Sequence, residues 1–239
     1  MAKKSAKWKP TLTAAKKHIL AQGEVIYASN LLHDRFFHLF NIALSLERPD
    51  EFGAETRFLN HALALWHVMQ SDSQQRKMAI TAIWTVPTKL THVLPIIERL
   101  EWAKLRTDKL AEYRNLVAHN TIMFSGHPKG RGRVIFLPSF GGRSTKPAHR
   151  PRLKDISLGF WATLRTDLLH LSDYVEALNQ QLLRRVYETK GGEYVGVPKT
   201  LPGKPRLKSL RLIRQLEETH SKGNAPKRHG QRRPSRGSP

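Results

Sequence analysis

One segment of the chain combines residue types that could cleave RNA without a metal. Residues 112–120 read Glu-Tyr-Arg-Asn-Leu-Val-Ala-His-Asn, so Arg114, Asn115 and His119 form the pattern R-N-x-x-x-H. Arg carries a permanent charge on a planar fork that matches phosphate, and it could stabilise charge that builds there. His titrates near neutral pH, so it could take a proton from a ribose 2′-OH or protonate the leaving oxygen. Asn could orient either side chain.

The spacing of this motif limits how it could work. Asn115 and His119 share a helical face, whereas Arg114 and His119 lie roughly 140° apart on a regular helix. The two can still border one groove, especially if a second chain supplies the other wall. A helix C-terminus would favour protonated His119. The alternative is structural: a single polar His near a helix end is usually a cap or a surface residue, and on the residues alone this alternative is favoured.

Apolar periodicity predicts the helices that would position the motif. Stripes at steps of three and four residues indicate helices over 13–22, 24–47, 55–69, 72–84 and 95–119. A stronger stripe from Phe160 to Leu182 indicates a further helix, which Asp155 or Ser157 would cap and Gly191 would end. Between 121 and 150, two short apolar runs flank a Gly-rich basic connector, which indicates a small β-hairpin or an ordered loop. We therefore expect an all-α bundle over 13–192, with an insert at about 121–150 and a basic extension over 1–12.

The charge of the chain points to a polyanionic partner. The 239 residues include 41 Lys and Arg against 19 Asp and Glu, a formal net charge of +22. RNA, DNA and an anionic membrane surface are the candidate partners, and a nucleic acid is favoured. Residues 197–239 hold twelve basic residues and only two acidic ones, which predicts a disordered basic tail; a short helix over 207–218 is an option within it. The expected nucleic-acid contacts are Lys129, Arg131, Arg133, Arg143, Lys146, Arg150 and Arg152 in the insert, and Arg206, Arg211, Arg214, Lys227, Arg228, Arg232 and Arg233 in the tail.

Other chemistries find little support in the sequence. The chain has no Cys, so disulfides, thiolate metal sites and a Cys nucleophile are excluded. No two His stand four apart in a His-Glu-x-x-His motif, and the Gly-rich connector lacks the spacing of a phosphate-binding loop. We therefore expect no metal and no cofactor. No apolar run is long enough to span a membrane or to serve as a signal peptide, so we expect a cytoplasmic protein without a membrane partner.

The string Arg-Asn-Leu-Val-Ala-His-Asn, residues 114–120, resembles the signature of the HEPN (higher eukaryote and prokaryote nucleotide-binding) family. Residues 65–76 also resemble bacterial members that carry an R-N-x-x-A-H segment, and the likeness would cover about residues 24–188. It implies an all-α bundle in which Arg114 binds phosphate, His119 is the general acid or base and Asn115 orients. It further implies a homodimer with facing motifs, and a defence or toxin setting with an antitoxin or regulatory partner. The insert at 121–150 departs from the simplest family pattern.

Three functions follow as hypotheses. The leading one is a metal-independent endoribonuclease of HEPN type. The second is a non-catalytic module that binds RNA or DNA, in which Arg114 and His119 are structural; some members of this family have lost activity. The third is a protein-interaction subunit that uses a helical face.

Overall fold

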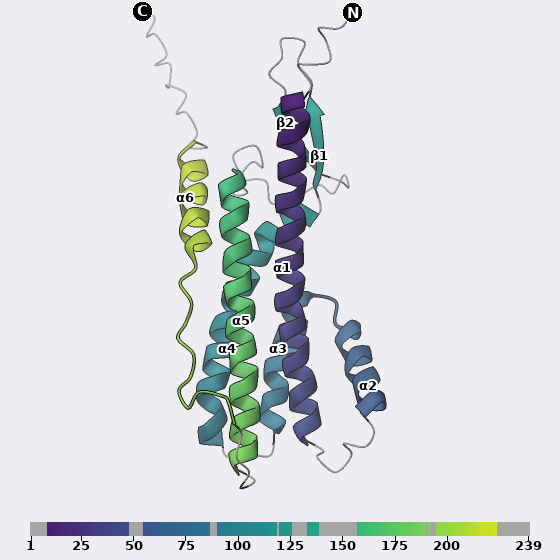
Figure 1. Ribbon diagram of the computed structural model, residues 1–239, viewed down its shortest axis with the longest axis vertical. Coiled ribbons are helices and arrows are strands. Elements are labelled where there is room, and N and C mark those ends of the chain that lie inside the picture. The colour runs from purple at the N-terminus through teal and green to yellow at the C-terminus, as the bar shows by residue number, and fades with distance from the viewer. Residues whose placement is uncertain are drawn as a thin grey trace, which may run out of the picture.

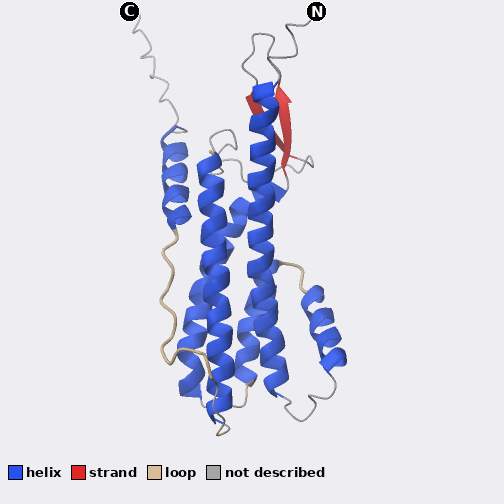
Figure 2. Cartoon of the chain, in the orientation of Figure 1, coloured by secondary structure: helices blue, strands red, loops and turns tan. Residues whose placement is uncertain are grey.

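The protein is a helical bundle with one small β-hairpin, as the sequence predicts. The computed structural model describes residues 9–47, 55–86, 90–118, 120–125, 133–138, 157–189, 191 and 195–223. The elements in chain order are α1 (Lys9–Glu47), α2 (Glu55–Val68), α3 (Asp72–Ala82), η2 (Ile83–Thr85), α4 (Leu90–Ala118), β1 (Asn120–Ser125), β2 (Arg133–Pro138), α5 (Leu158–Thr189) and α6 (Lys208–Gly223). Figures 1 and 2 show the long helices α1, α4 and α5 side by side, with α2 beside α1.

The core of the bundle lies between α1, α3, α4 and α5. Buried side chains on these helices recur at steps of three and four residues, for example Leu32, Phe36 and Leu39 on α1 and Leu164, Leu168 and Leu171 on α5. Such a spacing gives each helix one continuous apolar stripe. The predicted stripes of the first, fourth and last long helices are therefore confirmed.

Two predicted helix boundaries are wrong. Residues 13–22 and 24–47 belong to one helix, because α1 runs through Gly23 without a break. Glycine disfavours a helix interior but does not end it when the flanking turns are packed. Helix α4 begins at Leu90 rather than near Pro95. The proline lies close enough to the helix start that its missing N–H costs at most one backbone hydrogen bond.

The predicted insert is a hairpin at its described positions. Strands β1 and β2 pair antiparallel, with Asn120 opposite Pro138 and Ser125 opposite Arg133. The connector between the strands and the residues from 139 to 156 lie outside the described part of the chain. The hairpin directly follows α4, so it is attached to the helix that carries Arg114.

The largest correction concerns the tail. Residues 195–207 form an extended segment that runs back along α5 to α6, and we call residues 195–223 the strap (Figure 1). Ile213 of α6 is buried, and Leu201, Leu207 and Leu210 pack against the core. The prediction of a disordered tail that begins at residue 197 is therefore wrong for residues 197–223, whereas the predicted local helix is confirmed as α6. Residues 224–239 lie outside the described part.

Polar side chains of α5 and α4 hold the strap in place. The buried Asp167 of α5 accepts hydrogen bonds from the backbone N–H and the hydroxyl of Ser209, at the start of α6. The Arg184 guanidinium donates to the carbonyl of Pro198 over 2.7 Å, and Gln181 donates to the same carbonyl. Asp167 is only 2% exposed, so its charge is satisfied by the strap and the positive end of the α6 dipole.

Candidate functional site

Arg114 joins the motif helix to the start of α3. Its guanidinium forms an ion pair with Asp72, the first residue of α3, and the side chains are 20% and 41% exposed. Ser71 caps α3 by accepting a hydrogen bond from the N–H of Gln74, which fixes the turn that presents Asp72. The Arg114 Nε atom is buried and has no hydrogen-bond partner. Arg114 therefore has a structural partner and retains one unsatisfied donor.

A second ion pair lies about two turns earlier on α4. The Asp108 carboxylate accepts hydrogen bonds from Arg76 (2.7 and 3.1 Å), Lys104 (2.8 Å) and Ser73 (2.9 Å). Burial raises the pKa of Asp108, but the hydrogen bonds from Lys104 and Arg76 outweigh it, so the pKa lies below its usual value. Together with the Arg114–Asp72 pair, this network fixes the register of α4 against α3.

His33 of α1 lies in the electrostatic field of the same cluster. Its Nε2 atom accepts a hydrogen bond from the Trp66 indole over 3.0 Å, so Nε2 carries no proton. Burial lowers the pKa of His33; Asp72 and Asp34 oppose the shift, and Arg76 and Arg114 add to it. The neutral imidazole thus joins α1 to α2, next to the motif helix. Nothing in the sequence pattern distinguished His33 from the other eleven His.

The depressed pKa of His33 predicts a pH dependence of stability. The unfolded chain binds a proton at His33 below about pH 6.5, whereas the folded chain resists it, so the free energy of unfolding should fall as pH drops through that value. His18 has a lowered pKa too and acts in the same direction. We therefore compare wild type with His33→Gln by urea unfolding at about pH 7.5 and 5.5. The variant should lose less stability on acidification; an equal loss would contradict the assignment.

The other motif residues are described only in part. Asn115 is exposed on the last turns of α4. His119 lies outside the described residues, so the predicted geometry of the pair Arg114 and His119 stays a prediction. Asp72 and Asp108 were not predicted as partners of Arg114 and Arg76, although the predicted helix over 72–84 begins at Asp72.

The predicted nucleic-acid contacts divide into two groups. Arg133 is the first residue of β2, and the structure describes its backbone. The other cations assigned to the insert, and those assigned to the tail beyond residue 223, lie outside the described residues: Lys129, Arg131, Arg143, Lys146, Arg150, Arg152, Lys227, Arg228, Arg232 and Arg233. Arg206, Arg211 and Arg214 are described, and all three are exposed on the strap.

The strap carries an excess of positive charge on its exposed surface. Six cations are exposed, and we call this set the basic ridge: Lys199, Lys204, Arg206, Lys208, Arg211 and Arg214. The segment from 195 to 216 contains no Asp or Glu. Glu217 lies inward, where it accepts hydrogen bonds from Lys109 (2.9 Å) and from the hydroxyl of Tyr113 (3.3 Å) on α4. Glu218, the next residue, is exposed beyond the end of the ridge. The six cations of the basic ridge therefore lie on the folded domain with no acidic residue among them.

One aromatic side chain anchors the ridge. The Lys204 ammonium lies over the ring of Trp102, 5.6 Å from its centroid, and the Arg106 guanidinium lies 5.7 Å from the same centroid. Cation–π attraction of this kind holds a charge in place while leaving it accessible. Lys204 is accordingly both fixed and exposed.

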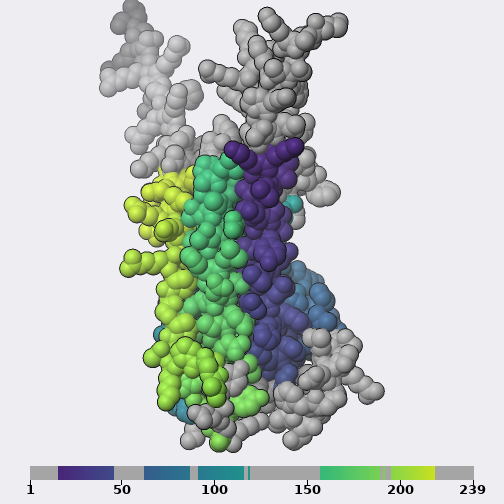
Figure 3. All heavy atoms as spheres, in the orientation of Figure 1, coloured from purple at the N-terminus to yellow at the C-terminus, as the bar shows by residue number. Residues whose placement is uncertain are grey.

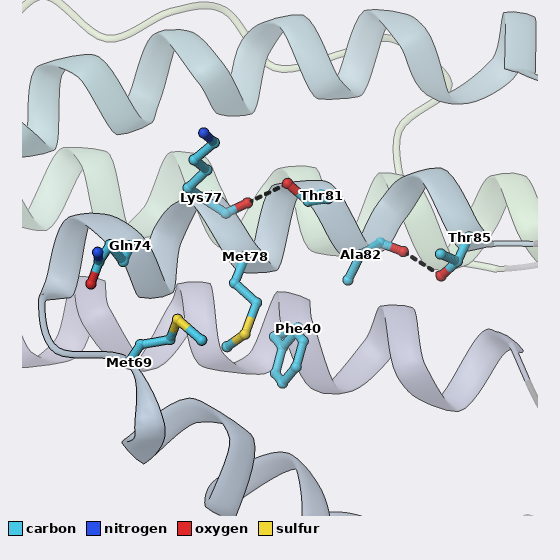
Figure 4. A pocket seen from close by; sticks show the side chains of 8 residues that line it. All are labelled: Phe40, Met69, Gln74, Lys77, Met78, Thr81, Ala82 and Thr85. Atoms are coloured by element: carbon cyan, nitrogen blue, oxygen red, sulfur yellow. Dashed lines mark hydrogen bonds between the residues drawn. The ribbon is translucent and has the colours of Figure 1, made fainter.

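A shallow groove lies between α1 and α3. It encloses about 440 Å³ and is lined by Phe40, Met69, Gln74, Lys77, Met78, Thr81, Ala82 and Thr85. In Figure 4 the two Met side chains lie near Phe40, while Lys77 points away from them. The Thr81 and Thr85 hydroxyls donate to backbone carbonyls of their own helical turns. The lining has no His, Asp or Glu, so it offers no acid–base pair.

Comparison with known proteins gives no family for this chain. None of the family models, curated proteins or solved structures compared with it matches. Within the described residues, no helix is both long enough and apolar enough to cross a membrane. Over the same residues, no three His, Asp or Glu side chains come together in a way that could hold a metal ion.

Proposed function

We propose that the protein binds RNA through the basic ridge of the strap. The observation that supports this most directly is the row of six exposed cations on the strap, with no Asp or Glu between residues 195 and 216. Phosphate backbones bind to such one-sign surfaces by releasing counterions, without need of a base-specific pocket. The net charge of +22 extends the same attraction over the whole chain.

RNA rather than duplex DNA is the preferred partner. The ridge follows an extended segment and one face of a helix, a shape suited to tracking a flexible single strand. The partly exposed ring of Trp102 lies beneath Lys204 and Arg106, so it could stack against a base. Resemblance of residues 114–120 to the HEPN signature favours RNA as well.

The salt dependence of binding tests the proposal. If six phosphates are contacted, the logarithm of the binding constant should fall with the logarithm of salt concentration with a slope of about −4 for a single strand. The double variant Arg211→Gln/Arg214→Gln should reduce that slope by about 1.4. Fluorescence anisotropy with a single-stranded RNA would measure it. Arg165→Gln is the matched control, because Arg165 is an exposed cation paired with Glu24 of α1. Equal slopes for all three proteins would contradict the proposal.

A second candidate function is metal-independent RNA cleavage by Arg114 and His119. It is favoured by the position of Arg114, whose guanidinium is partly exposed near the end of α4. A phosphate could compete with Asp72 for this side chain, since both are anions matched to the same fork. Cleavage in excess EDTA by wild type but not by His119→Ala, with 2′,3′-cyclic phosphate products, would establish this activity. Binding without cleavage would leave RNA binding as the function.

A further inference from the structure

Helix α1 exposes a regular stripe on the side that faces away from the core. Its members are Lys16, Leu20, Gly23, Tyr27, Asn30 and Asp34, all of them exposed, and we call this set the α1 stripe. Tyr27 is 67% and Leu20 65% exposed, and Ile19 beside them is 55% exposed. Figure 3 shows α1 uncovered along the front of the molecule. Large apolar side chains gathered on one face indicate a contact surface.

The spacing of positions in the α1 stripe is the same when it is read from either end. The steps are four, three, four, three and four residues, so the stripe maps onto itself when its direction is reversed about residue 25. At about 100° per residue, positions 23 and 27 lie roughly 20° on either side of the midline, and positions 20 and 30 roughly 40°. A twofold axis through this midline therefore brings each position directly opposite its counterpart on a second copy.

We propose that two copies of the protein pair through α1, antiparallel, about a twofold axis near residue 25. Tyr27 of each copy then lies over Gly23 of the other. Gly23 has no side chain, and a Cβ there would meet nothing within 4 Å in the single chain. The fold of one copy thus does not require glycine at this position, and glycine disfavours a helix interior. The space that it leaves fits an aromatic ring of a second copy.

Charge complementarity supports the same pairing. Under the twofold axis, Lys16 of one copy lies opposite Asp34 of the other, and the contact occurs twice. Leu20 lies opposite Asn30, so the branched Leu20 side chain and the Cβ methylene of Asn30 flank the central rings. The Lys16–Asp34 contacts lie at the two ends of the stripe, where they disfavour a parallel arrangement, which would place Lys16 against Lys16.

The strength of this interface should be moderate. A single pair of helices buries less surface than a standard stable interface of about 1,600 Å². The net charge of +22 on each copy adds repulsion over the whole molecule. We therefore expect a reversible dimer with a dissociation constant on the order of micromolar at roughly physiological salt.

Sedimentation of the full chain, without RNA, tests the proposal. Wild type should change from monomer to dimer as its concentration passes through about the micromolar range. Gly23→Gln should raise the dissociation constant at least about tenfold, because its side chain fills the space needed by Tyr27 of the partner copy. The Gly23→Gln variant should keep the helical circular dichroism of wild type, because a Cβ at residue 23 meets no atom within 4 Å in the single chain. Gly203→Gln is the matched control, because Gly203 is exposed on the strap and equally free of neighbours.

A charge exchange provides the second arm of the test. Lys16→Asp and Asp34→Lys should each weaken the dimer, and the double variant Lys16→Asp/Asp34→Lys should restore it. A protein that stays monomeric, or a dimer that responds to none of these changes, would overturn the proposal. Neither result bears on RNA binding, because the basic ridge is unchanged in every variant.

Cross-linking defines the direction of the pairing. The chain has no Cys, so single Cys residues report only the contacts under test. A mixture of Leu20→Cys and Asn30→Cys proteins should form a mixed disulfide, whereas Leu20→Cys alone should not. Asn115→Cys, exposed on α4, should give no cross-link. A cross-link through residue 115 instead would show that the motif helices face one another, and it would overturn the α1 pairing.

Discussion

A chain that ends at residue 194 should lose cooperative folding, whereas a chain that ends at residue 223 should keep the stability of the full protein. The chain that ends at residue 194 lacks the buried Ile213. It also lacks hydrogen-bond partners of three buried side chains of α5, namely Asp167, Gln181 and Arg184. The deletion also removes the apolar contacts of Leu201, Leu207, Leu210 and Ile213 with the core. A large apolar side chain contributes about 1.5–3 kcal/mol when it is fully buried, and partly buried ones contribute less. The sum, roughly 5 kcal/mol or more, equals much of the stability of an ordinary domain.

Thermal and urea unfolding of the two truncations would measure this effect. The chain of residues 1–223 is the control, because it removes five tail cations and leaves every described contact in place. We expect its free energy of unfolding to lie within about 0.5 kcal/mol of the full chain. Equal stability of both truncations would show that the strap is not part of the folded domain.

Arg76→Met should destabilise the protein by about 2–3 kcal/mol. Arg76 is 3% exposed, and it is bound to Asp108, a carboxylate that also holds Lys104 and Ser73. Removal of one partner from a buried ion pair costs about 3–5 kcal/mol. We expect less here, because the Asp108 side chain is 26% exposed and keeps two of its partners.

Two further proteins make the measurement specific. Arg165→Met removes an exposed ion pair with Glu24, so it should change stability by less than about 1 kcal/mol. Arg76→Met/Asp108→Leu removes both charges and should recover part of the loss, as replacement of a whole buried pair often does. Urea unfolding of all four proteins would provide the comparison. A loss no larger for Arg76→Met than for Arg165→Met would contradict the structural role of the network.

The apolar periodicity of the sequence was sufficient to predict most helices of the bundle. The stripes on α1, α4 and α5 are long and regular, so the apolar spacing determined both the existence of each helix and its buried face. Boundaries were less well determined. Gly23 and Pro95 are signals of helix ends in isolation, but packing of the flanking turns outweighs both.

The strap could not be predicted from composition because its partners are distant in sequence. Its Lys, Arg and Pro content is typical of disorder. The strap is held in place by single polar side chains of α5, such as Asp167 and Arg184, and by the aromatic ring of Trp102 on α4. None of these long-range pairs leaves a local signal. The short helix that the sequence offers over 207–218 was the one local indication of α6.

The candidate site shows the same limit. Arg114 was recognised by its motif, but its ion pair with Asp72 joins residues on two helices that no spacing rule relates. Glu217 accepts hydrogen bonds from Lys109 and Tyr113 of α4, and these contacts become visible only when α6 is placed beside α4. Burial and the nearby Glu217 carboxylate raise the pKa of Tyr113, so this hydroxyl stays a donor.

The most direct test of the proposed function is RNA binding by the chain of residues 1–223, in excess EDTA and at two salt concentrations. This chain keeps the basic ridge and lacks the tail cations from Lys227 onward. If the ridge is the binding surface, binding should remain, should weaken with salt, and should weaken further when Arg211 and Arg214 are both replaced by Gln. A folded chain of residues 1–223 that shows no affinity for RNA would contradict the proposal and assign binding to the tail.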